Sequence, residues 1–192
     1  MSPISYILAS SSPRRKELLK LIGIEPRIFK PQTDESREPG ESVETFLKRV
    51  TIEKGGDVYM EDYFENPVIS SDTIVLCEGR LIGKPADAVE AREFLELLSG
   101  NVHEVWTGLA VKYRGRVYYD VARTKVSFSP ISASELDHYL EHENYMDKAG
   151  AYAIQGLASV FVNKIDGCYF NVMGFPINLF YNMLKRMDIE LF

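Results

Sequence analysis

The chain has 192 residues, 45% of them hydrophobic and 26% charged, which fits a globular protein with one large domain or two small lobes. The formal net charge of −6 argues against a nucleic-acid-binding protein, which usually carries a basic excess. Cys77 and Cys168 offer neither a disulfide framework nor metal-ligand spacing, and we find no signal or membrane-spanning segment, so we expect a cytoplasmic protein without a membrane partner.

The chain opens with a strand and a helix. The apolar run 4–9 predicts a buried strand, and residues 26–30 predict a second one. Between them, Ser12 fits an N-cap, Pro13 fits the first helical position, and Gly23 ends the helix.

A polar loop follows the second predicted strand, and Ser42 can cap the next helix. The apolar residues of that helix repeat with a helical period that extends to Lys54. The stretch 66–85 reads as a strand with a polar centre and a turn at 78–79. Asp87 then opens another helix.

The second half contains a long hairpin. Residues 102–113 and 117–128 form its predicted arms, and a capping box at 132–135 starts a helix that reaches about residue 142. We expect a strand pair within 159–173, and Pro176 opens a final helix rich in Leu, Phe and Met. Helices alternating with strands, plus one long hairpin, predict an α/β fold with a sheet of mixed direction.

Arg14 and Arg15 stand in the first turn of the first predicted helix, where the macrodipole already carries positive charge. A helix N-terminus that follows a serine-rich strand end can hold a phosphate, and two arginines strengthen such a site. No Walker A sequence is present. The alternative is that both arginines are solvated surface residues.

Two further candidate residues, one in a predicted strand and one in a loop, are charged. Asp72 lies among apolar residues of a predicted buried strand, so its carboxylate should meet a cation, a metal or a reacting water. A structural, hydrogen-bonded aspartate is the alternative. Lys84 follows in a loop, where lysines are usually solvated.

The glycine-bearing loop 147–156 contains Asp147, Lys148 and Gln155. Gln155 both donates and accepts hydrogen bonds, which suits recognition of the edge of a nucleobase. It could equally be a polar residue of a turn with no role in binding. His138 and His142 share one face of a predicted helix, as two metal ligands could, but the H-E-x-x-H arrangement is absent, so we interpret them as surface or half-buried residues.

Taken together, the motifs resemble the Maf family of nucleoside triphosphate pyrophosphatases. The resemblance covers nearly the whole chain, in the order LASSSPRRKELL, DES, EK, SSDTIV, GKP, LSGNVHEVWTG, DKAGAYAIQG and VMGFP. It implies one Maf-type domain over 1–192 with a mixed, twisted sheet, flanking helices and two lobes around a nucleotide-binding cleft (an ITPase-like fold), often as a homodimer. It also implies hydrolysis between the α and β phosphates with a divalent cation, Mg²⁺ or Mn²⁺.

The resemblance also assigns roles to residues. Asp72 matches the catalytic position that would deprotonate the attacking water, and Glu35 with Asp72 would hold the metal. The positions that would face the triphosphate are Ser10, Arg14, Arg15, Lys54 and Lys84.

Three positions indicate the dTTP/UTP type within the family. Members of that type carry Arg, Thr and Gln where this chain has Arg14, Thr73 and Gln155, whereas members acting on a methylated guanine nucleotide differ at all three. One departure is Ser71, where a small residue such as Ala is frequent. The runner-up interpretation is a nucleotide-sensing regulator of cell division, because the family name derives from a septum-formation phenotype.

Overall fold

The structure is a computed structural model that describes residues 4–56, 58 and 64–191. The chain folds into two compact units, each made of several segments. Unit 1 contains the chain up to Asp72, Thr107–Ala122 and the chain from Gly174, and unit 2 contains Thr73–Trp106 and Arg123–Met173.

One mixed sheet has the strand order β2-β1-β3-β5-β6-β7, with β4 paired to β3. The strands are β1 (Ile7–Ala9), β2 (Arg27–Phe29), β3 (Val68–Cys77), β4 (Arg80–Ile82), β5 (Val102–Tyr113), β6 (Arg116–Phe128) and β7 (Val162–Asp166). β1 is parallel to both β2 and β3, and Ala9 is level with Phe29 and Ser70. The same edge of the sheet therefore gathers the carboxyl ends of β1 and β2 beside the middle of β3.

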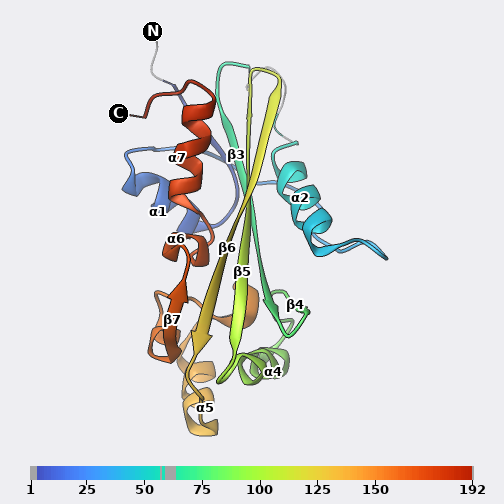
Figure 1. The fold of residues 1–192 in the computed structure, drawn as a ribbon, viewed down its shortest axis with the longest axis vertical. Coiled ribbons are helices and arrows are strands. Elements are labelled where there is room, and N and C mark those ends of the chain that lie inside the picture. The colour runs from blue at the N-terminus through green and yellow to red at the C-terminus, as the bar shows by residue number, and fades with distance from the viewer. Residues whose placement is uncertain (1–3, 57, 59–63, 192) are drawn as a thin grey trace. The chain divides into compact units, whose positions relative to one another are not determined.

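In unit 1, helices cover both faces of the strands. Helices α1 (Pro13–Leu21) and α7 (Ile177–Arg186) lie on one side, and α2 (Val43–Lys54) lies on the other (Figure 1). The ring of Phe180 from α7 packs edge-on against Tyr6, which precedes β1. On the α2 side, Gly108 of β5 leaves no room for a Cβ atom against the Thr51 side chain. This glycine allows the helix to lie directly on the strand.

Unit 2 has its own hydrophobic core. Helices α4 (Ala88–Leu98) and α5 (Ala133–His142) pack together and contribute Leu95, Leu98 and Tyr139 to it. The 3₁₀ segments Ala149–Ala151 and Leu157–Phe161 and the short helix α6 (Tyr169–Val172) complete the unit. Phe128, Tyr152 and Phe161 add an aromatic cluster to this core.

Most predicted elements are present, including the Ser42 cap, the turn at 78–79 and the capping box at 132–135. The expected strand pair within 159–173 is wrong. The segment contains one strand, β7, because Gly167 turns the chain with φ of +133° and Tyr169–Val172 then form a helix. Ser12 is the N-cap of α1 by position, but its side chain makes no capping hydrogen bond.

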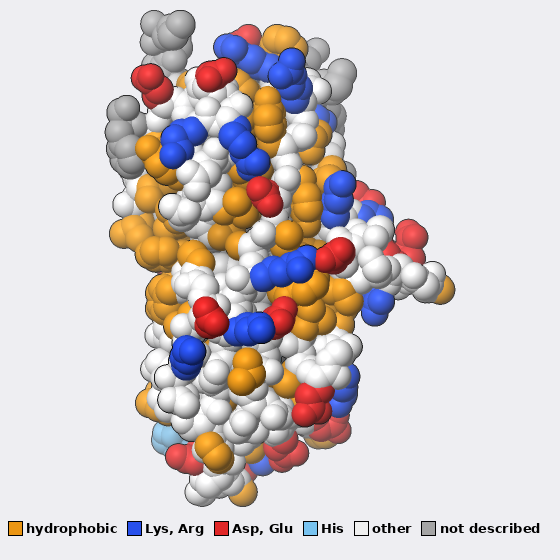
Figure 2. All heavy atoms as spheres, viewed as in Figure 1, with side chains coloured by type: hydrophobic (Ala, Val, Ile, Leu, Met, Phe, Trp, Pro, Cys, Tyr) orange, Lys and Arg blue, Asp and Glu red, His pale blue; other side chains and the backbone are white. Residues whose placement is uncertain are grey.

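The described part of the chain contains no helix that is long and apolar enough to cross a membrane. Its described side chains on the face drawn in Figure 2 mix both signs of charge, as the net charge of −6 suggests. Among the described side chains, this face therefore carries no broad basic surface.

Candidate active site

The parallel strands β1, β2 and the first part of β3 lie beside one another and position several of the predicted site residues. Ser10 directly follows β1, Glu35 lies in the loop after β2, and Asp72 is two residues beyond the Ser70 position that pairs with Ala9. Because carboxyl ends of parallel strands share one edge of a sheet, residues distant in sequence meet there. Such an edge is the usual place for a ligand in an α/β protein.

Lys54 lies between the two predicted carboxylates. Its Nζ donates to Asp72 Oδ1 at 2.6 Å and lies 3.0 Å from Glu35 Oε1. The side chains of Lys54 and Asp72 are buried (6% and 11% exposed), whereas Glu35 is 47% exposed. Removing an ion from water costs several kcal/mol, and for this pair the mutual attraction offsets a cost of about that size. Each ion is therefore stable in this buried position only while its partner is present.

Helix α2 explains why a lysine occupies this buried position. Phe46, Leu47 and Val50 form its buried face, and Lys54 continues that face one turn beyond Val50. The four-carbon stem can therefore pack with the apolar residues while the ammonium reaches β3. Ser70 Oγ donates to Thr51 O at 2.7 Å and fixes the end of α2 against the same strand.

Arg15 turns back from α1 toward the strand end instead of toward solvent. Its Nε donates to Gly174 O at 3.0 Å, and its Nη1 donates to Ser10 Oγ at 3.2 Å. The backbone N–H of Ser12 also donates to Ser10 Oγ, at 3.1 Å. A buried hydroxyl, a guanidinium and a helix N-terminus thus surround one position, as in an anion-binding site.

Electrostatics link Arg15 to the carboxylates. Burial lowers the pKa of Arg15, the charges of Asp72 and Glu35 raise it, and the neighbouring Arg14 lowers it. Arg14 itself is half-buried in the same helical turn. Two cations at the positive end of a helix are unfavourable without a ligand, and an anion at this end would relieve the repulsion.

Glu35 and Asp72 also fit a divalent metal. Both carboxylates contact Lys54 Nζ, which occupies the position between them, so their oxygens lie near one another. The described residues include no group of three or more His, Cys, Asp or Glu side chains that could hold a metal by themselves. Mg²⁺ commonly binds to one or two carboxylates and takes its other ligands from water and substrate phosphates. This donor pair therefore suits a metal that binds together with a polyphosphate.

Three predicted site residues belong to unit 2. Thr73 is half-buried in β3, whereas Lys84 and Gln155 are exposed in loops. The loop before Gln155 is shaped by Gly150, whose φ is +72° and whose N–H donates to Gly83 O. Glu143 Oε2 accepts from the N–H of Leu157 at 3.0 Å and occupies the space where a side chain on Gly156 would lie. These contacts hold the chain on both sides of Gln155.

Comparisons with known proteins agree with this arrangement. A family model described as "Maf-like protein" matches residues 5–187. A protein from Syntrophomonas wolfei named dTTP/UTP pyrophosphatase is 42% identical over 181 residues, covering 93% of this chain and 95% of its own length. One from Bacillus cereus with the same name is 39% identical over 184 residues, or 96% of each chain.

The chain belongs to the Maf family. The mixed sheet with flanking helices that the resemblance implied is therefore confirmed. The family match also spans segments of both units, so the residues of unit 1 and unit 2 described above are parts of one Maf sequence.

Two contacts of this Maf site could not be found from the sequence. Gly174 accepts from Arg15 through its backbone carbonyl, and Ser71 Oγ lies 3.5 Å from the same oxygen. A carbonyl carries no sequence signal of its own. In the sequence, only the VMGFP motif indicated that this segment matters. The positive φ of residue 174 (+98°) explains why a glycine occupies this position.

The two histidines of α5 lie on the helix surface, as expected. Their rings stack with centroids 4.2 Å apart, and His142 Nδ1 is 2.8 Å from His138 O. In the described part of the chain they join no third ligand.

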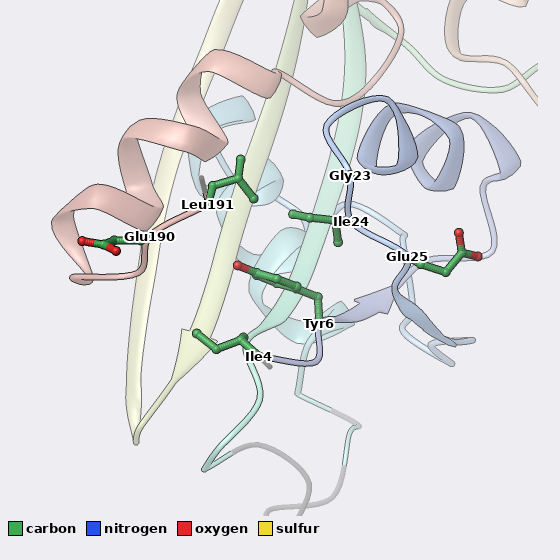
Figure 3. Close-up of a pocket in the computed structure, with 7 residues that line it drawn as sticks. All are labelled: Ile4, Tyr6, Gly23, Ile24, Glu25, Glu190 and Leu191. Carbon is green, nitrogen blue, oxygen red and sulfur yellow. The ribbon is translucent and has the colours of Figure 1, made fainter. Parts of the chain in front are cut away.

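A pocket of about 260 Å³ in unit 1 contains none of the predicted site residues. Its lining consists of Ile4, Tyr6, Gly23, Ile24, Glu25, Glu190 and Leu191. Figure 3 shows Tyr6, Ile24 and Leu191 turned toward one another, while the carboxylates of Glu25 and Glu190 point away. This lining includes two glutamates and, among the described residues, no lysine or arginine, so it does not suit a phosphate.

Proposed function

We propose that this protein hydrolyses dTTP and UTP between the α and β phosphates, yielding the nucleoside monophosphate and pyrophosphate. The convergence of Asp72, Lys54 and Glu35 carries the proposal, because it joins two carboxylates to a buried cation and because both carboxylates act electrostatically on Arg15 of α1. The names of the two relatives support the substrate class.

The triphosphate would bind where cations collect at the start of α1. Arg15 and Ser10 already meet there, and the half-buried Arg14 shares the same helical turn. A guanidinium can bind phosphate oxygens in a bidentate manner, and the helix end adds backbone N–H groups. Lys54 and Lys84 would add further positive charge toward the leaving pyrophosphate.

Glu35 and Asp72 would hold Mg²⁺ or Mn²⁺. When bound, the metal would neutralise charge on the phosphate oxygens. Asp72 would also accept the proton of the attacking water, since its carboxylate lies in β3 and acts electrostatically on Arg15, which would bind the phosphates. Lys54 keeps that carboxylate oriented through the 2.6 Å hydrogen bond.

Base selection would depend on Gln155 and Thr73, with Arg14 as the third position typical of the dTTP/UTP type. A glutamine can pair with the carbonyl and N–H of thymine or uracil in one plane. Cytosine presents a different pattern of donors and acceptors, so the hydrogen bonds to Gln155 would be mismatched and binding would be weaker.

We further propose that the protein acts on free nucleotides in the cytoplasm, as a homodimer.

A substrate panel tests the function. The purified protein, with Mg²⁺ or Mn²⁺, is given dTTP, UTP, CTP and 7-methylated GTP, and released pyrophosphate is measured by malachite green after adding inorganic pyrophosphatase. We expect kcat/KM to be highest for dTTP and UTP. Binding without turnover of any of these nucleotides would contradict the proposal and favour a nucleotide-sensing role.

A double variant tests base selection separately. Gln155→Glu combined with Thr73→Gln should reduce the preference for dTTP and UTP over 7-methylated GTP. The exposed Gln32 offers a matched control as Gln32→Glu, which should leave the preference as in the parent. Unchanged ratios in the double variant would mean that other residues select the base.

A further inference from the structure

The loop that carries Glu35 has no helix or strand of its own. It spans 30–42, between the end of β2 and the start of α2, and the Glu35 side chain is 47% exposed. An exposed side chain on an irregular loop needs other contacts to stay in one place. The contacts of this loop with α2 supply them.

Arg49 of α2 ties this loop to the helix. Its Nε and Nη2 donate to the two carboxylate oxygens of Glu41, each at 2.9 Å, and Nη2 also donates to Ser36 O at 2.9 Å. Its Nη1 donates to Glu53 Oε2 at 3.2 Å, one helical turn further along. One guanidinium thus joins the backbone next to Glu35 and the end of the loop to α2.

The loop reinforces these contacts internally. The N–H of Ser36 donates to Asp34 Oδ1 at 2.8 Å, and the N–H of Glu38 donates to Glu41 Oε2 at 3.1 Å. Arg37 donates to the backbone carbonyl of Glu41. Both chain neighbours of Glu35 therefore have fixed hydrogen bonds, and the Ser36 carbonyl is fixed by Arg49.

Burial and charge favour a persistent contact. The Glu41 side chain is only 5% exposed and Arg49 is 22% exposed. The hydrogen bond from Arg49 lowers the pKa of Glu41, and the same bond raises the pKa of Arg49. A planar guanidinium matches a carboxylate in two parallel bonds, which a lysine ammonium cannot do.

We propose that Arg49 is a positioning residue for Glu35, holding the loop so that the Glu35 carboxylate stays beside Lys54. The same helix then acts on both sides of Glu35: Arg49 holds the carbonyl of the next residue, Ser36, and Lys54 meets the Glu35 carboxylate. The inference rests on the proposed hydrolysis of nucleoside triphosphates.

A double-mutant cycle tests whether Arg49 acts through Glu35. Arg49→Gln should lower kcat/KM for dTTP about 10- to 100-fold, since small displacements in an active site cost on that order. On the Glu35→Gln background, the same substitution should change kcat/KM less than about 3-fold, because the group that it positions is gone. An equal loss on both backgrounds would overturn the proposal.

Arg49→Lys and Glu41→Gln give independent variants. Lysine keeps the charge without the two parallel bonds, so its kcat/KM should lie between those of the parent and Arg49→Gln. Glu41→Gln keeps the size of the side chain that Arg49 contacts but removes its negative charge. It therefore tests the same contact if Arg49→Gln does not fold. Parent-like activity in a folded Glu41→Gln variant would count against the proposal.

Hydrogen exchange supplies a readout that does not depend on turnover. Peptides covering 33–42 should exchange faster in Arg49→Gln, with peptides of unit 2 unchanged. Arg92→Gln is the matched control, because Arg92 also pairs with carboxylates (Asp137 and Glu96) on a helix, but in unit 2. It should change neither activity nor exchange of the loop.

The outcomes separate this proposal from the proposed function. A parent protein that hydrolyses none of the nucleotides refutes the function, while loop exchange still reports whether Arg49 holds the loop. An active parent whose Glu35→Gln variant is impaired, but whose Arg49→Gln variant is not, refutes the positioning role alone.

Discussion

Each unit of the protein buries a polar cluster, but the two clusters differ in charge. In unit 1, a lysine ammonium meets two carboxylates within 3.0 Å. In unit 2, the neutral groups of His103 and Tyr152 meet, with His103 Nε2 2.7 Å from the tyrosine hydroxyl. Both clusters contain buried members, so burial alone does not distinguish a reactive site from a structural one.

The surroundings decide which form each cluster takes. His103 packs edge-on against Phe128 and Tyr152, and burial lowers its pKa to about 4. Because these neighbours are aromatic and carry no charge, the imidazole stays neutral. In unit 1 the strand ends place opposite charges together, and the Glu35 side chain stays partly exposed to water. Of the two arrangements, the one in unit 1 combines charged groups with partial exposure to water.

The largest effect is expected from Asp72→Asn. Loss of a positioned general base should lower kcat for dTTP about 100- to 10,000-fold. Nucleotide binding should persist, because Arg15 and Ser10 remain at the start of α1. The measurements are steady-state kinetics and calorimetric binding of a nonhydrolysable analogue.

Asp137→Asn is the matched control for this change. Asp137 is a 67% exposed carboxylate of unit 2 that pairs with Arg92, so its variant should keep parent-like kcat. Near-normal turnover by Asp72→Asn would show that another group activates the water.

Lys54→Met should reduce stability in the same cluster. The substitution keeps the length of the stem but leaves the buried Asp72 carboxylate without its 2.6 Å partner. Breaking a buried ion pair by removing one member costs about 3 kcal/mol or more. We expect the free energy of unfolding in urea at pH 7 to fall by about that amount. The double variant Lys54→Met with Asp72→Asn should recover part of it, and a double variant as unstable as the sum of both would argue against the pairing.

The sequence allowed us to predict the burial of residues better than the contacts between residues that are distant in the chain. The helical period of α2 extended to Lys54, and Lys54 is buried. Its contact with Asp72 depends on the alignment of Ala9 with Ser70 and on the packing of α2 against β3, which local periodicity does not encode. Arg49 was missed for the same reason, because its bonds to the loop before α2 depend on how that loop folds.

The error at 159–173 arose because the local composition and the tertiary contacts favour different structures. The residues after Gly167 are aromatic and β-branched, which favours a strand by composition. Asn171 is fully buried, however, and its Nδ2 donates to Val105 O and Thr124 Oγ1. These tertiary contacts hold Tyr169–Val172 as a helix and override the propensity.

His103→Gln should change the pH dependence of stability in unit 2. The pKa of His103 is about 4 in the folded protein and ordinarily 6.5, so the unfolded chain binds more protons between these values. Stability therefore falls as the pH drops through this window, by about 2 kcal/mol between pH 7 and pH 5 from this residue alone. The variant should lack that part of the loss. Urea unfolding of both proteins at pH 7 and pH 5 measures this difference. An equal loss of unfolding free energy in the parent and the variant would mean that His103 is charged in the folded state at pH 5.

The smallest effect is expected from replacing His138 and His142 together by alanine. These imidazoles are a third group of titratable side chains, but they stack on the surface of α5, and His142 Nδ1 already contacts the His138 carbonyl. We predict that metal dependence arises at Glu35 and Asp72 instead. Activity removed by EDTA should therefore return at the same Mg²⁺ concentration in the double variant and in the parent, within about 2-fold. A requirement for far more metal would assign the metal to the histidines, and Glu35→Gln, measured in parallel, should be the variant that needs it.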